Sequence, residues 1–78
     1  SQHSLAASLL GKVVTVTRVS EKGEATTETG YVDIVSLKDK ELKLTVNGKS
    51  YTMNEIVQIY DNTYYLTEQY NSGLVDGD

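Results

Sequence analysis

The sequence predicts an all-β fold, a small five-stranded barrel with a short helical stub before it and an acidic tail after it. Two observations support this class. Proline is absent, and Val, Thr and Ile make up 21 of the 78 residues, a composition that favours strands. An Asn-Gly pair also separates two short runs of apolar and polar residues, which is the strongest short-range signal for a β-hairpin.

The N-terminal segment, residues 1–11, is predicted to be a linker or helical stub. Ser4 is a suitable N-cap, Ala and Leu propagate a helix, and Gly11 stands where a C′ glycine is expected. An isolated helix this short does not hold in water. We therefore expect either part of a longer helix or a helix that packs on the barrel through Leu5, Leu9 and Leu10.

The barrel is predicted over residues 12–60, with strands at residues 12–18, 26–37, 41–46, 49–53 and 56–60. Asn47-Gly48 is expected to form a type I′ turn, because both residues tolerate a positive φ. Asn54 is expected to cap one helical turn before the last strand. Gly30, inside the long second strand, predicts a bulge or sharp bend.

The apolar alternation within these strands predicts the core. The predicted core residues are Val14, Val16, Val32, Ile34, Leu42, Leu44, Val46, Tyr51, Met53, Ile56, Val57 and Ile59. A bulge at Gly30 would place Val35 instead of Ile34 on the inner face, because a one-residue slip reverses every side chain.

This set of elements is typical of an SH3-like or Tudor-like barrel. Five short strands, a long bent second strand and one helical turn before the fifth strand support the interpretation together. An OB-fold is the nearest alternative, but it usually needs a longer chain and a helix between its third and fourth strands.

Charge separates the barrel from the tail, residues 61–78. Residues 1–60 hold seven basic and seven acidic side chains, whereas residues 61–78 hold four acids and no base. The tail therefore carries the whole net charge of −4. We expect that cutting the chain after Asp61 leaves the barrel folded; a large drop in melting temperature on this truncation would show that the tail belongs to the core.

Composition argues against several classes of function. Cysteine is absent and the single histidine is His3, so a thiol nucleophile, a His-based zinc site or a catalytic triad is not expected. The carboxylate pairs Glu21/Glu24 and Asp39/Glu41 lie in polar turns, where solvated charge is the simpler interpretation. We expect no enzyme, no cofactor, no metal site and no catalytic residue. The neutral barrel argues against nucleic acid as a partner, and no apolar run is long enough for membrane insertion.

Six tyrosines are the most distinctive side chains. Tyr31, Tyr51 and Tyr60 fall in the barrel, where they would form either an aromatic cage for a methylated Lys or Arg or packing contacts in place of the absent Phe and Trp. The candidate interaction surface comprises Tyr60, Tyr64, Tyr65 and Tyr70. The open strand edges of so small a barrel also invite association with another chain.

Residues 6–16, AASLLGKVVTV, resemble a segment of the flagellar hook-capping (hook assembly scaffolding) protein family. In that family A-x-S-L-(I/L)-G-K-x-V-x-(V/Y) joins a helical region to a Tudor-like domain. The resemblance continues through Gly30-Tyr31-Val32 and through residues 44–51 and 53–59, LTVNGKSY and MNEIVQI, which are similar to the family's V-x-G-x-x-Y/V-x-L-x-D-I-x-x-I/V. It covers about residues 5–60.

The resemblance is to the short, Gram-positive form, in which the Tudor-like domain stands alone without an inserted immunoglobulin-like domain. It implies a non-enzymatic scaffold that is made in the cytoplasm, exported through the flagellar type III apparatus and placed at the tip of the growing hook. Its implied partners are hook subunits and further copies of itself, the latter through an N-terminal export and cap-forming region that this sequence does not contain. The chain begins with Ser1 rather than Met, so we expect it to be part of a longer protein. The alternative is an SH3-like module that binds a peptide, a modified residue or nucleic acid.

Overall fold

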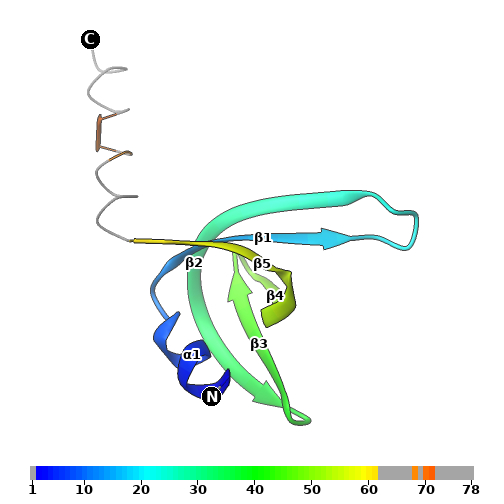
Figure 1. Cartoon of the computed structure of the whole chain (residues 1–78), viewed down its shortest axis with the longest axis horizontal. Coiled ribbons are helices and arrows are strands. Elements are labelled where there is room, and N and C mark those ends of the chain that lie inside the picture. The colour runs from blue at the N-terminus through cyan, green and yellow to red at the C-terminus, as the bar shows by residue number, and fades with distance from the viewer. Residues whose placement is uncertain (1, 62–67, 69, 72–78) are drawn as a thin grey trace.

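The computed structural model describes residues 2–61, 68 and 70–71, and it is mostly β. A short helix, α1, precedes five strands, and a 3₁₀ turn, η1, lies between the last two strands (Figure 1). The elements in chain order are α1 (Gln2–Ser8), β1 (Val13–Val19), β2 (Ala25–Lys38), β3 (Glu41–Val46), β4 (Lys49–Thr52), η1 (Met53–Glu55) and β5 (Ile56–Tyr60). The predicted helix, five strands and single helical turn are therefore all present, with small shifts at their ends.

The five strands form one antiparallel sheet in the order β4-β3-β2-β1-β5. The fourteen-residue β2 joins its two halves, because residues 25–31 pair with β1 and residues 32–38 pair with β3. Figure 1 shows β2 curving from the β1 side of the sheet to the β3 side. The predicted bend in the second strand is thus present, and it gives the sheet a concave face.

A register shift explains the direction of the side chains along β2. Val32 pairs with Val46 and Ile34 pairs with Thr45, so Asp33 is the extra residue of a bulge. The expectation of a bulge at Gly30 is wrong by three residues. Its consequence holds, because Val35 packs against the core and Ile34 is 55% exposed.

Gly30 has a different role, which is to leave space for a neighbouring side chain. Its φ is not positive, but a Cβ at this position would lie 2.5 Å from Asn47 Oδ1. The Asn47 side chain lies across this position, and its Nδ2 donates to the Thr29 carbonyl (3.3 Å). A residue with a Cβ here would displace the Asn47 side chain, so glycine fits because of close approach rather than backbone conformation.

The core lies on the concave face of the sheet. It consists of Leu9, Val14, Val16, Val32, Leu44, Val46 and Tyr51, with Val35, Met53 and Ile56 packed against it. Three core predictions are wrong, since Ile34, Val57 and Ile59 are each at least half exposed. The bulge turns the Ile34 side chain to the other face. Val57 and Ile59 belong to β5, which among the described residues has a neighbouring strand on one side only. Leu42 is half-buried, and Val13, which was not predicted, is fully buried.

Helix α1 packs on the sheet through a different set of residues from the predicted one. Ala6 of the helix and Leu9 of the turn that follows it are buried, whereas Leu5 and Leu10 are about half exposed. The helix also begins at Gln2, so the expectation that Ser4 is the N-cap is wrong. The C-terminal signal is confirmed, because Gly11 has φ +81° and follows the last turn. We expected either part of a longer helix or a helix that packs on the strands through three leucines. The structure shows packing on the strands, but of the three leucines only Leu9 is buried.

Two tight turns connect the three strands β2, β3 and β4. Asn47 and Gly48 both have positive φ, as the predicted type I′ turn requires. The turn between β2 and β3 has the same feature, but its residues are Asp39 (φ +51°) and Lys40 (φ +65°). A side chain with a Cβ is strained in this region, so the β2–β3 turn is the less favourable of the two.

Replacing Lys40 with glycine should therefore stabilise the protein. We expect Lys40→Gly to raise the free energy of unfolding by about 0.5–1 kcal/mol, because glycine adopts this φ without strain. Urea unfolding followed by circular dichroism measures the change. The matched control is Lys43→Gly, within β3, which should destabilise instead; a loss of stability for both variants would contradict the turn assignment.

Candidate functional site

The four tyrosines predicted to form an interaction surface are only partly described. Tyr60 ends β5 and is half-buried; its hydroxyl accepts a hydrogen bond from Thr15 Oγ1 and donates one to Gln58 Oε1, both at 3.3 Å. Tyr70 is 67% exposed. Tyr64 and Tyr65 lie outside the described residues, so a surface shared by all four tyrosines stays a prediction.

The three tyrosines of the sheet lie on two faces. Tyr31 and Tyr60 are the partners of Val13 in β2 and β5, so they share its face. Tyr51 packs with Val14 in the core, and successive residues of a strand point to opposite faces. The three rings therefore do not converge on one aromatic cage.

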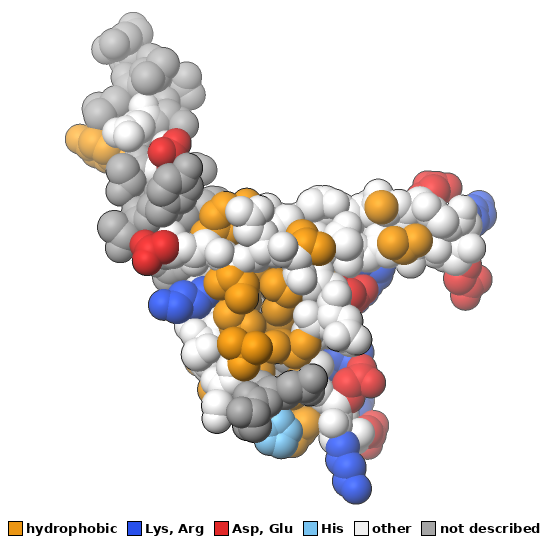
Figure 2. All heavy atoms as spheres, in the orientation of Figure 1, with side chains coloured by type: hydrophobic (Ala, Val, Ile, Leu, Met, Phe, Trp, Pro, Cys, Tyr) orange, Lys and Arg blue, Asp and Glu red, His pale blue; other side chains and the backbone are white. Residues whose placement is uncertain are grey.

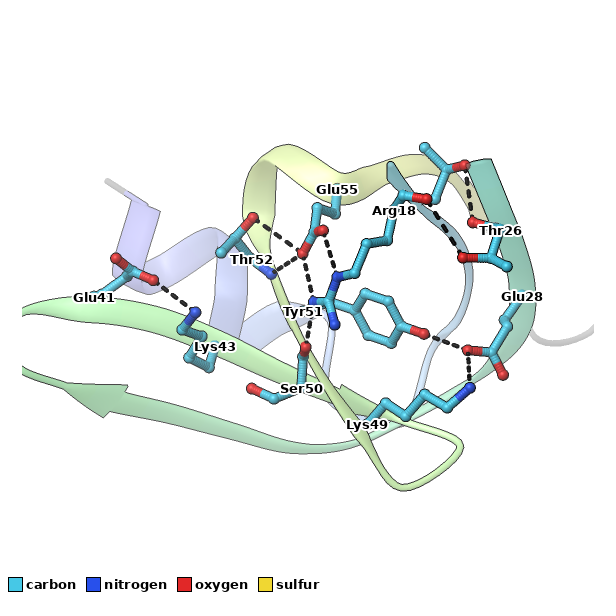
Figure 3. A network of polar contacts seen from close by, with 11 residues as sticks. Arg18, Thr26, Glu28, Glu41, Lys43, Lys49, Ser50, Tyr51, Thr52 and Glu55 are labelled. Atoms are coloured by element: carbon cyan, nitrogen blue, oxygen red, sulfur yellow. Dashed lines mark hydrogen bonds and ion pairs between the residues drawn. The ribbon is translucent and has the colours of Figure 1, made fainter. Parts of the chain in front are cut away.

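The concave face carries a polar network that we call the Arg18 clamp (Figure 3). Arg18 extends from β1 and binds Glu55 of η1 through two parallel contacts, Nε to Oε2 and Nη2 to Oε1, both 2.9 Å. The same Nη2 donates to the Ser50 carbonyl of β4 (2.6 Å). The guanidinium carbon lies 4.5 Å from the centroid of the Tyr51 ring. One side chain thus joins β1 to η1 and to β4, which is separated from β1 by β3 and β2 in the strand order.

The clamp continues from Tyr51 to the other side of the concave face. The Tyr51 hydroxyl donates a hydrogen bond to Glu28 Oε2 of β2, and Lys49 Nζ lies 3.1 Å from the same oxygen. The Arg18 clamp therefore comprises Arg18, Glu28, Lys49, Ser50, Tyr51 and Glu55. Within it, the negative charges of Glu28 and Glu55 are balanced by the positive charges of Lys49 and Arg18.

The local sequence explains why these side chains meet. Arg18 follows Val14 and Val16 at two-residue intervals, so it points to the same concave face. Glu55 is the third residue after Thr52, at the N3 position of the 3₁₀ turn, and its Oε1 accepts the Thr52 backbone N–H (3.0 Å). This capping-box arrangement holds the carboxylate in place for the guanidinium. Thr52 rather than the predicted Asn54 is therefore the N-cap.

The clamp shifts the titration of its acids. Hydrogen bonds from Arg18 and from the Thr52 backbone lower the pKa of Glu55 to about 2. The hydrogen bond from Tyr51, helped by Lys49, lowers the pKa of Glu28. The same contact with Glu28 raises the pKa of the Tyr51 phenol above its ordinary value. The clamp is therefore complete when both carboxylates are ionised and the phenol is neutral.

Stability should accordingly fall in acid. A carboxylate whose pKa is lower in the folded state stabilises that state above its unfolded pKa, and this contribution is lost as the pH falls through the folded value. For Glu55 the range extends from about pH 4.5 down to about pH 2. We expect a loss of about 1–3 kcal/mol over this range. Urea unfolding at pH 5 and at pH 2.5 measures it; an equally steep loss in Glu55→Gln would contradict the assignment to this residue.

The clamp is suited to holding structure rather than to reacting with a ligand. Its charged groups already bind each other, and no buried side-chain N or O atom of the described residues lacks a hydrogen-bond partner. Among these residues no three His, Cys, Asp or Glu side chains cluster as metal ligands would. A separate hollow lies between the β2–β3 turn and η1, lined by Lys40, Glu41, Leu42, Thr52, Met53 and Asn54. Its lining mixes charged, polar and apolar groups.

A more distinctive surface is the exposed apolar one near β5. Val57 is 59% exposed and Ile59 is 50% exposed, and Leu5 of α1 is 50% exposed. Figure 2 shows hydrophobic side chains gathered between the β5 region and α1. Exposed apolar side chains that form one contiguous patch are typical of a place where another chain binds.

Sequence reasoning did not find the clamp, although two signals for it exist. One is the presence of charged residues at concave-face positions: Arg18 continues the alternation of Val14 and Val16, and Glu28 is the partner of Val16 in β2. The other is the Thr52-x-x-Glu55 spacing of a capping box. That Arg18 and Glu55 meet across 37 positions of the sequence depends on the curvature of the sheet.

The described fold and surface define a small antiparallel β-sheet protein with a short helix. No protein-family model matches this chain, and neither a curated protein nor a solved structure matches it significantly. In the described part of the chain, no helix is both long and apolar enough to cross a membrane.

Proposed function

We propose that this chain is the Tudor-like domain of a flagellar hook-capping protein and that it acts as a non-enzymatic scaffold through protein–protein contacts. The observation that carries the proposal is the placement of the resembling segments. Residues 6–16 span the junction of α1 with β1, Gly30-Tyr31-Val32 lie at the middle of β2, and residues 44–51 contain the Asn47-Gly48 turn. Residues 6–16 and 44–51 thus contain connections between elements, and Gly30-Tyr31-Val32 lie where β2 changes its pairing partner from β1 to β3.

The SH3-like or Tudor-like barrel is part of the same proposal. The strands follow one another as an antiparallel meander except that β5 returns to the far side of β1. A 3₁₀ turn carries the chain from β4 to β5, and it contacts both β1 and β3. The Arg18 contact with the Ser50 carbonyl links β1 to β4. These features support a sheet that curls toward closure.

The proposed setting is the growing hook. The longer protein would be exported through the flagellar type III apparatus, form an oligomeric cap at the hook tip through regions outside this sequence, and permit hook subunits to polymerise. The candidate contact surfaces are the exposed apolar residues of β5 and the tail tyrosines. The alternative of an SH3-like module that reads a methylated residue gains little support, because the face of the Tyr51 ring already holds Arg18.

Hook formation tests the proposal. In the bacterium that encodes this chain, deleting residues 12–60 from the protein should leave cells without assembled hooks, as seen by electron microscopy of isolated flagellar bases. Complementation with the intact protein should restore hooks of normal length. Normal hooks in the deletion strain would contradict the proposal.

A further inference from the structure

The two outer strands of the sheet, β4 and β5, differ in how well their free edges are protected. An outer strand leaves a row of backbone N–H and C=O groups unpaired, and proteins usually cover or shorten such edges. Strand β4 is four residues long and begins with Lys49. Its Ser50 carbonyl accepts Arg18 Nη2 at 2.6 Å. The edge of β4 is therefore already blunted by the chain itself.

Two backbone hydrogen bonds, one at each end of β1, show which way the backbone N–H and C=O groups of this strand point. The Val32 N–H donates to the Lys12 carbonyl, and the Ser20 N–H donates to the Glu24 carbonyl. Lys12 and Ser20, before and after β1, thus direct backbone groups to the β2 side. Because successive residues in an antiparallel strand alternate between neighbours, the even-numbered residues of β1 face β2 and the odd-numbered ones face β5.

The same alternation fixes the free edge of β5. Thr15 and Val13 pair with Gln58 and Tyr60, so those two residues direct their backbone groups toward β1. Ile59, between them, directs its N–H and C=O away from β1. Among the described residues no strand lies on that side. One N–H and one C=O group are therefore presented outward at the middle of the edge.

The side chains of β5 do not protect its free edge, because the strand lacks charged residues and exposes apolar ones. The strand Ile56–Tyr60 contains no charged residue. Val57 is the extra residue where the β1–β5 register shifts, and Val57 and Ile59 are 59% and 50% exposed. Exposed apolar side chains beside unpaired backbone groups favour the addition of a strand.

Charge favours one kind of partner strand for this edge. Asp61 directly follows β5 and begins the tail, residues 61–78, which carries the net charge of −4. A partner strand with basic residues beside Asp61 has the complementary charge.

We propose that the free edge of β5 binds an extended segment of another protein, which adds to the sheet as an antiparallel strand. The segment has alternating apolar side chains and Lys or Arg at its N-terminal end, which lies beside Asp61. This inference rests on the strand geometry and charge alone. Its failure would therefore leave the proposed function in hook assembly standing.

The test uses a synthetic peptide, N-acetyl-KKVTVTIT-amide, and the full 78-residue chain labelled with ¹⁵N. Titration followed by NMR should shift the amide signals of residues 57–60 most strongly. The Ile59 amide should exchange with solvent at least tenfold more slowly when the peptide is bound, because its N–H becomes part of a ladder. Shifts confined to other residues, or no binding at millimolar peptide, would overturn the proposal.

Two matched variants and a second peptide sharpen the result. Ile59→Lys should weaken binding at least tenfold, because charges on an edge strand oppose pairing. Ile34→Lys, at an equally exposed isoleucine of the internal strand β2, should bind like the unchanged chain. A peptide with Glu in place of both lysines should bind at least fivefold more weakly. Equal binding by both variants or by both peptides would contradict the proposal, as would a concentration-dependent dimer in sedimentation experiments that blocks the peptide.

Discussion

Replacing Leu44 with alanine should lower the free energy of unfolding by about 3 kcal/mol, the largest effect expected from a single substitution in this chain. Leu44 is fully buried at the centre of the concave face, opposite Tyr51 in β4 and Val35 in β2. A cavity at this position removes contacts with both strands. A change of this size in a domain of 78 residues should lower the melting temperature by about 12–24 °C.

Leu37 provides a matched control for this effect, because it is the same residue type in the neighbouring strand but is 54% exposed. Leu37→Ala should cost less than about 1 kcal/mol. Chemical unfolding of both variants gives the two values. A similar loss in each would show that the packed core is not centred on Leu44.

Replacing Arg18 with methionine should have the second-largest effect, a loss of about 2 kcal/mol. Methionine keeps much of the apolar stem but removes the two bonds to Glu55, the bond to Ser50 and the contact with the Tyr51 ring. Hydrogen bonds to charged groups are each worth about 1.5–3 kcal/mol, and the partial exposure of Arg18 reduces their net value. The loss should be smaller at pH 2.5, where Glu55 begins to be protonated.

A double-mutant cycle separates the clamp from simple packing. Arg18→Met, Glu55→Gln and the combined variant should show a coupling of at least about 1 kcal/mol, because the two side chains contact each other directly. Lys43 and Glu41 form a control pair within β3, at the exposed surface (2.7 Å), and should couple by less than about 0.5 kcal/mol. Additive effects in the Arg18–Glu55 cycle would contradict the role of the clamp.

Much of the fold could be predicted because its signals are local. Asn47-Gly48 fixes a turn by its φ angles, Gly11 ends a helix, and two-residue alternation identifies Leu44 and Val46 as buried. These features depend on residues within a few positions of one another. They can therefore be predicted without knowledge of the tertiary contacts.

The wrong predictions concern features that depend on contacts between residues far apart in the sequence. Alternation along β2 could not reveal that the bulge lies at Asp33, because its position depends on pairing with β3. Ile59 has the right face for the core, since it pairs with Val14, yet it is half exposed because β5 is an outer strand. Burial at an outer strand depends on what lies beside it, which strand patterns do not encode.

The candidate site also depends on contacts between residues that lie far apart in the sequence. The assignment of Tyr60 to an interaction surface stays a prediction; in the structure its hydroxyl has two hydrogen-bond partners within the chain. The Arg18 clamp was not found, because its members come from three strands and the 3₁₀ turn. The different protection of the two sheet edges could likewise be recognised only from the strand order, in which β5 lies next to β1 and no other described strand lies on its far side.

If this domain belongs to a hook-capping scaffold, as we propose, the protein should be found on assembling flagella. Immunogold labelling with an antibody against residues 12–60, in cells arrested before filament formation, should place gold particles at the distal ends of growing hooks. Cells in which these residues are deleted provide the control and should show no label. Label confined to the cytoplasm, with bare hook tips, would contradict the proposed role in hook assembly.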